Sequence, residues 1–213
     1  MSDGKTDRQN GSELTQHTFP KATNKISWGE AIALFLVLAF AAFLRYYKID
    51  EIPPGFNSDE AVGAVGALET LRSGIRLYYE GQGGGGALGF YIVALAFALF
   101  GPSIATIRGT AAFAGMVSIV ATYFFVREAF REEDGTAGRA SNSVVSTRLL
   151  AMMATLAMAT SSWHFQSSRI AFAAIGVPFL QVPAFFFLWR GLNSRRTRHF
   201  ILSGIFLALV AFI

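Results

Sequence analysis

The residues best suited to chemistry are two adjacent carboxylates, Asp59 and Glu60, in the segment FNSDE. They follow a loop with paired prolines, and apolar residues recur at helical spacing after them. A helix that begins here carries both acids in its first turn, where unpaired backbone N–H groups stabilise negative charge. An ionised carboxylate in this position suits a general base or a metal ligand better than a general acid.

The same segment also has a purely structural interpretation. Asn57 and Glu60 have the spacing of a capping box, and Gly74 is a typical helix stop. The predicted helix has one apolar face, made of Val62, Val65, Leu68 and Leu71. A short amphipathic helix beside a membrane span is expected to lie along the membrane surface.

Long apolar segments must position this loop. The chain has 213 residues, of which 53% are hydrophobic and 15% charged, whereas soluble domains are about 25% charged. A bilayer core needs roughly 20 helical residues per span. Segments of this character cover residues 26–47, 87–100, 109–126, 149–165, 170–189 and 200–213. The sequence therefore predicts an all-α, polytopic transmembrane helical bundle.

The ends of the chain carry two further expectations. Residues 1–25 are polar and mixed in charge, which predicts a disordered cytoplasmic tail before a membrane module at 26–213. The last apolar segment is short for a span and has no polar tail. We expect the chain to be the N-terminal part of a longer protein and to be inactive alone if the rest is required.

The loop charges favour one topology. If residues 87–100 do not cross the membrane, twelve of the 18 Lys and Arg lie on the side of the N-terminus, against six if they cross. The positive-inside rule then favours a segment that does not cross and a cytoplasmic N-terminus. This topology places the Asp59 loop, Arg108 and Arg169 together on the outer side.

Several classes of function are excluded. The chain has no cysteine, which excludes disulfides and thiolate metal sites. No P-loop, dinucleotide fingerprint or zinc motif is present. The net charge of +4 is interpreted as a topology signal, not as nucleic-acid binding. The triplet Arg195, Arg196 and Arg198 is interpreted as a cytoplasmic anchor, with lipid-headgroup binding as the alternative, and His164 as a hydrogen-bonded interfacial histidine.

Three segments carry a resemblance to a known family: residues 53–74 (PPGFNSDEAVGAVGALETLRSG), residues 78–130, and residues 163–172 (WHFQSSRIAF). In order and character they resemble the N-terminal part of multi-span glycosyltransferases of the GT-C fold. The closest resemblance is to family 39, the protein O-mannosyltransferase and aminoarabinose-transferase type. Such enzymes transfer sugar from a polyprenyl-phosphate carrier to an acceptor hydroxyl on the outer or luminal face, with inversion. The resemblance leaves open whether the acceptor is a lipid, a glycan or a protein.

The resemblance also implies roles for residues. Asp59 matches the catalytic acid of the family's first loop and is expected to act as base on the acceptor hydroxyl, with Glu60 assisting or structuring the loop. Arg108 and Arg169 are expected to bind the donor phosphate, and interfacial snorkelling is the alternative for both.

Two questions stay open at this level. Many relatives have an acidic residue just before the segment that contains Tyr91, where this chain has Gly83 to Gly86, so a divalent metal is neither implied nor excluded. Other classes of function also remain, namely a transporter or flippase-like protein and a non-catalytic membrane scaffold.

Overall fold

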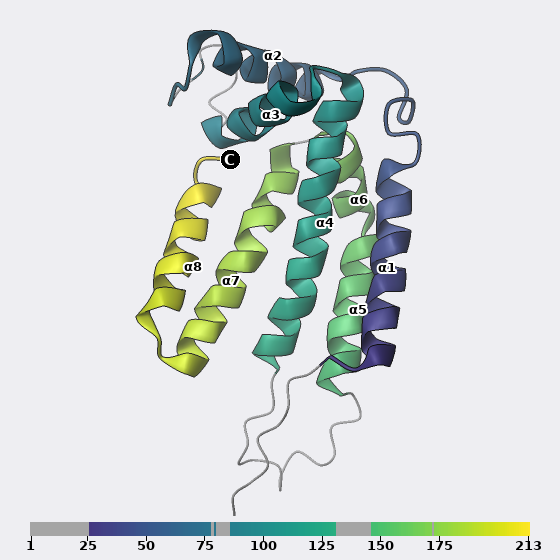
Figure 1. The fold of residues 1–213 in the computed structure, drawn as a ribbon, viewed down its shortest axis with the longest axis vertical. Coiled ribbons are helices and arrows are strands. Elements are labelled where there is room, and N and C mark those ends of the chain that lie inside the picture. The colour runs from purple at the N-terminus through teal and green to yellow at the C-terminus, as the bar shows by residue number, and fades with distance from the viewer. Residues whose placement is uncertain (1–25, 78, 80–85, 131–145, 172) are drawn as a thin grey trace, which may run out of the picture.

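The computed structural model describes residues 26–77, 79, 86–130, 146–171 and 173–213. All regular elements in this part of the chain are helical: α1 (Trp28–Tyr46), α2 (Ser58–Ser73), α3 (Ala87–Phe100), α4 (Ile104–Ala129), α5 (Thr147–Thr160), α6 (Ser162–Arg169), the 3₁₀ turn η1 (Ala173–Ile175), α7 (Gly176–Ser194) and α8 (Thr197–Val210). Five helices, α1, α4, α5, α7 and α8, run side by side, while α2 and α3 lie across one end (Figure 1). We call this end the loop end and the opposite one the turn end.

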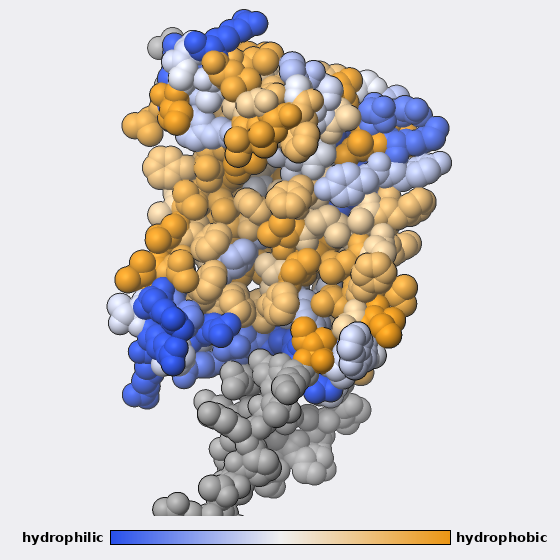
Figure 2. Space-filling model, in the orientation of Figure 1, coloured by the Kyte–Doolittle hydropathy of each residue, from blue (hydrophilic) through white to orange (hydrophobic). Residues whose placement is uncertain are grey.

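Three of the described helical segments are long and apolar enough to cross a membrane: Trp28–Tyr46, Ile104–Ala129 and Ala173–Ser194. Their presence agrees with the prediction of a helical membrane protein. Apolar side chains also form a broad band around the visible face, with hydrophilic residues gathered at the two ends (Figure 2). This distribution is the one expected for a bundle surrounded by lipid.

Two predicted segments differ from full spans. A single helix over residues 149–165 is wrong, because the chain breaks at Ser161 into α5 and the shorter α6. α3 packs against α2 and lies across the loop end (Figure 1). That is the arrangement expected of an apolar segment that does not cross. The predicted tail at 1–25 lies outside the described residues.

α4 is central and contacts α1, α3, α5, α6 and α7. Its buried side includes Ala111, Ala112, Gly115 and Ser118, which recur three and four residues apart. Small side chains at this spacing allow helix backbones to approach closely in a membrane. The approach is tightest at Gly115, where an added Cβ would lie 2.8 Å from the Cβ of Ser168 in α6.

α2 has the predicted ends but a different packing face. The Asn57–Glu60 capping box is present, and Gly74 ends the helix with a φ of 81°. The residues buried in α2 include Gly66 and Ala67, because a glycine at 66 lets the Phe90 ring of α3 pack against the backbone. The predicted apolar face is largely left outside: Val62, Val65 and Leu71 are 40%, 49% and 47% exposed. An exposed apolar face beside the bundle is what contact with a membrane surface requires.

Candidate active site

A buried ion pair joins α2 to α4 at the loop end. The Nε of Arg108 donates to Oε1 of Glu60 at 2.6 Å, and its Nη2 donates to Oε2 at 3.1 Å. Both side chains are almost fully buried, with exposed fractions of 1% and 0%. Glu60 also accepts from the backbone N–H of Asn57 at 3.0 Å, as part of the capping box. The carboxylate of Glu60 is therefore fully engaged in holding the start of α2.

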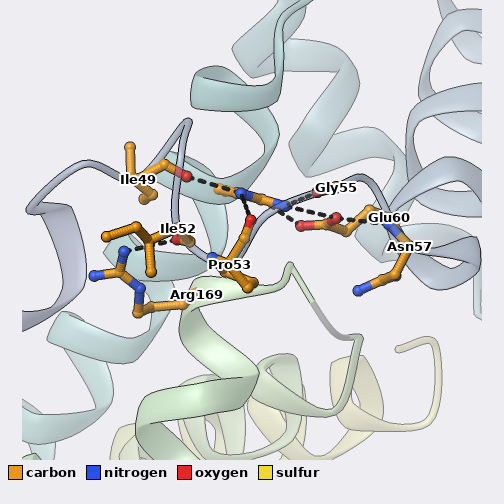
Figure 3. A network of polar contacts seen from close by, with 8 residues as sticks. Ile49, Ile52, Pro53, Gly55, Asn57, Glu60 and Arg169 are labelled. Carbon is orange, nitrogen blue, oxygen red and sulfur yellow. Dashed lines mark hydrogen bonds and ion pairs between the residues drawn. The ribbon is translucent and has the colours of Figure 1, made fainter.

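The remaining donors of Arg108 hold the loop that leads to α2. Its Nη1 donates to the carbonyls of Ile49 and Pro53 at 3.1 and 3.0 Å, and Nη2 donates to that of Gly55 at 2.6 Å. With the two bonds to Glu60, these contacts use all five N–H donors of a guanidinium. Figure 3 shows this network, in which the guanidinium lies between the loop carbonyls and the Glu60 carboxylate.

Arg169, the last residue of α6, holds the beginning of the same loop. Its guanidinium donates to the carbonyls of Leu44, Tyr47 and Ile52, the last two at 2.9 and 2.7 Å. It also lies over the Phe165 ring, 5.8 Å from the ring centre. Buried backbone carbonyls that lie outside regular structure need donors. Arg108 and Arg169 supply them to a loop with little secondary structure of its own.

This geometry changes the interpretation of both arginines. They lie at the same end of the bundle as Asp59, as the preferred topology requires, but all five donors of Arg108 and three hydrogen bonds of Arg169 go to the chain's own oxygens. Arg108 has no donor left for a phosphate, and neither arginine is exposed beyond 6%. The interfacial-snorkelling alternative fails for the same reason, because both guanidinium groups are buried. We describe the two residues as positioning residues.

Asp59 differs from Glu60 in its exposure and in its ion pairing. Its side chain is exposed, whereas that of Glu60 is buried one residue later. Asp59 makes no ion pair with the described residues. It occupies the first turn of α2, where the helix dipole stabilises an ionised carboxylate. Asp59 is thus the member of the pair that is free to meet a substrate.

The carboxylate of Asp59 lies at the wall of a pocket of about 320 Å³. The rest of the wall is mainly apolar, and includes Gly63 from α2, Phe90 and Val93 from α3, Ile107 and Phe113 from α4, and Phe179 from α7. Among the described residues that line it, Asp59 is the one that carries a charge. A single carboxylate at the wall of an apolar pocket suits an amphipathic ligand.

Gly86 has a packing role that the sequence did not indicate. An added Cβ at Gly86 would lie 2.0 Å from the carbonyl of Phe212. The backbone N–H groups of Gly86 and Leu88 donate to the carbonyls of Ile213 and Phe212, at 3.1 and 3.0 Å. The residue admits the chain's own backbone at the start of α3.

A second buried cluster is formed by Arg45, His164 and Ser118, and no motif in the sequence predicted it. Arg45 is fully buried near the end of α1, and its Nη2 lies 2.9 Å from Nδ1 of His164. Nε2 of that ring lies 2.8 Å from the hydroxyl of Ser118 in α4. The histidine was expected at an interface, but only 5% of it is exposed.

The break between α5 and α6 explains how Arg45 is tolerated without a carboxylate. Where a helix is interrupted, carbonyls in its last turn lose their N–H partners. Arg45 donates to one of these, the Ala159 carbonyl, from both Nη atoms at 3.2 Å, and to the Ala41 carbonyl at 3.2 Å. The cation also lies at the negative end of the α5 dipole.

The side chains that could ligate a metal do not form a metal site in the described residues. Among the described residues, no group of three or more His, Asp or Glu is placed to hold a metal ion. Glu60 does not fit as a ligand, because Arg108 and the Asn57 N–H already engage its oxygens. Of the stretch Gly83 to Gly86, where the family resemblance would place an acid, residues 83–85 are outside the described part of the chain.

Comparison with protein-family models, with curated proteins and with solved structures found no match to this chain. A function for this chain must therefore be inferred from the geometry of the loop end.

Proposed function

We propose that this chain belongs to a membrane glycosyltransferase that takes sugar from a polyprenyl-phosphate donor, with Asp59 as the general base. The observation that carries the proposal is the contrast between the two adjacent acids. Glu60 is locked in a buried ion pair, while Asp59 is exposed at the wall of an apolar pocket. Two buried arginines hold the loop that leads to Asp59 against α4 and α6. The Asp59 carboxylate is therefore attached to a rigid part of the structure.

The chemistry requires one proton acceptor. The acceptor hydroxyl gives its proton to the Asp59 carboxylate as its oxygen bonds to the anomeric carbon of the sugar. The bond from that carbon to the phosphate oxygen breaks, and its electron pair leaves on the phosphate. Because the leaving group is already a phosphate, the reaction needs a base more than a general acid. The apolar pocket wall suits the lipid part of such a donor.

Arg108 and Arg169 enter this proposal as positioning residues. They hold the loop, so they are not assigned to the departing phosphate. No other described residue is assigned to that charge.

The buried charge in the bundle does not favour a transporter. Intramembrane charges in transporters mark substrate or ion pathways. Arg45 is the second-last residue of α1, at the loop end, and it is bonded to backbone carbonyls of α1 and α5. This arrangement fits a structural role at a helix break.

The test is sugar transfer from a polyprenyl-phosphate-linked donor in membranes that contain the protein. Asp59→Asn keeps the size and hydrogen-bonding capacity of the side chain but removes the base, so we expect a loss of about 10²- to 10⁴-fold in rate. Asp50→Asn is the matched control, since Asp50 is an exposed aspartate of the same loop. Near-normal transfer by Asp59→Asn would remove Asp59 as the base.

A further inference from the structure

Four exposed arginines gather around the turn between α7 and α8, at the turn end of the bundle. They are Arg190, one turn before the end of α7, Arg195 and Arg196 between the helices, and Arg198 in the first turn of α8. We call this group the arginine turn. It forms the strongly hydrophilic corner below the apolar band in Figure 2.

The charge of the arginine turn is not neutralised within the described part of the chain. None of its four members makes an ion pair with a described residue. The carboxylate that pairs with arginines at this end is Glu30, which lies 3.3 Å from Arg127 and 3.7 Å from Arg148. Clustered cations that repel one another at a surface favour an external anion.

Aromatic and apolar side chains indicate how deep the arginine turn lies in the membrane. Trp189 precedes Arg190 and is 40% exposed, as is Phe200, which follows α8's first turn. Leu192 is 55% exposed between them. Tryptophans of membrane proteins concentrate at the level of the lipid headgroups. The guanidinium groups beside Trp189 therefore lie at the depth of the lipid phosphates.

The start of α8 adds backbone N–H groups at the same place, of which that of His199 is already bonded to the Arg196 carbonyl at 3.0 Å. The N-cap of this 14-residue helix is Arg196, and no side chain caps its first N–H groups. Free N–H groups at a helix N-terminus attract anions. The arginines and the helix start thus present donors of one sign to the same ligand. The arginines supply the bidentate geometry that phosphate oxygens accept.

We propose that the arginine turn binds the headgroups of anionic phospholipids and keeps these lipids beside α7 and α8. The ligand chemistry is a phosphate diester with net negative charge, held at the edge of an apolar surface. This inference is independent of the proposed transfer reaction, because Asp59 lies at the opposite end of the bundle.

The protein's tryptophans make the test direct. Trp28→Phe with Trp163→Phe leaves Trp189 as the reporter beside the arginine turn. Trp28→Phe with Trp189→Phe leaves Trp163, in α6, as the matched control. Each variant is reconstituted in phosphatidylcholine bilayers that contain brominated phosphatidylglycerol or brominated phosphatidylcholine, which quench nearby tryptophan. We expect Trp189 to show a preference of about threefold or more for the anionic lipid, lowered by 0.5 M NaCl because salt screens the attraction at about that concentration. We expect Trp163 to show no such preference.

Changes within the arginine turn separate specific binding from general effects. Replacing Arg195, Arg196 and Arg198 with Gln should abolish the preference at Trp189, and replacing them with Lys should keep only part of it, because lysine retains the charge but not the bidentate geometry. Equal quenching by the two lipids at Trp189, or a preference that survives the Gln substitutions, would overturn the proposal.

Discussion

Arg108 is a buried cation whose five N–H donors all meet oxygen atoms. Removing an ion pair from water costs several kcal/mol per ion, and the cost is repaid only when the geometry is good and the other donors are also paired. Here Glu60 supplies the charge and three loop carbonyls supply the remaining acceptors. A lysine offers three donors from one point and lacks the planar fork. The site therefore requires arginine.

The pair should be costly to break from one side. Glu60→Gln leaves the Arg108 cation buried without a counter-charge, and such losses are about 3–5 kcal/mol. We expect a clear fall in the thermal unfolding temperature in detergent and faster proteolysis of the loop between α1 and α2. The control is Lys48→Ala, which removes an exposed ion pair to Glu51 in the same loop, worth about 0–1 kcal/mol. Equal effects of the two substitutions would contradict a structural role for the buried pair.

At the scale of elements, the positions of the helices follow from the sequence, but the breaks between them do not. Runs of apolar residues mark α1, α3, α4, α7 and α8, and the capping box marks α2. The break at Ser161 has no proline or glycine to announce it. The Ala159 carbonyl beside the break is bonded by Arg45, more than a hundred residues earlier in the chain. Single-sequence patterns do not contain such distant pairings.

The candidate site shows the same limit. The sequence identified Asp59, Glu60, Arg108 and Arg169, and the structure brings all four to the loop end. The pattern could not show which of the two acids is accessible, because exposure separates Asp59 from Glu60 and only the fold sets exposure. Nor could a pattern show that loop carbonyls, and not a substrate, meet the arginines. That pairing depends on where the loop folds back against α4 and α6.

Gly115 of α4 packs tightly against α6, so it should not tolerate a side chain. An added Cβ would lie 2.8 Å from Ser168 and 3.4 Å from Nε of Arg45. We expect Gly115→Ala to destabilise the protein by about 1–3 kcal/mol through overpacking, measured as a lower unfolding temperature. Gly109→Ala in the same helix has nothing within 4 Å of the new Cβ. It should be neutral or stabilise by up to about 1 kcal/mol through helix propensity. A neutral Gly115→Ala would mean that α6 can move away from α4 at little cost.

At the scale of the molecule, the two ends of the bundle differ in chemistry. The loop end holds the exposed Asp59, the pocket, and the buried Arg108 and Arg169, which are bonded to loop carbonyls. The turn end holds exposed arginines and the Glu30 cluster. In a membrane the end rich in exposed Lys and Arg is expected on the cytoplasmic side. The Asp59 pocket then opens on the opposite face, where a lipid-linked sugar donor would be used.

The absence of cysteine from the chain makes this arrangement testable with single added thiols. We choose three exposed positions, Ser58 at the start of α2, Ala105 at the start of α4 and Ser194 at the end of α7. If α3 lies across the loop end without crossing, Ser58→Cys and Ala105→Cys are on the same side of the membrane. Both should react quickly with a membrane-impermeant maleimide added to intact cells. Ser194→Cys should react only after the membrane is permeabilised, because the turn end lies on the other side.

The three reactivities distinguish the possible arrangements. If α3 is a span, Ser58→Cys and Ala105→Cys lie on opposite faces and only one of them is labelled from outside. If the orientation is reversed, Ser194→Cys alone is labelled in intact cells, and the positive-inside argument fails for this protein. Labelling of all three under permeabilised conditions is the control that each thiol is accessible. Only the pattern in which Ser58 and Ala105 react together, apart from Ser194, keeps the Asp59 pocket on the outer face and α3 out of the membrane-crossing set.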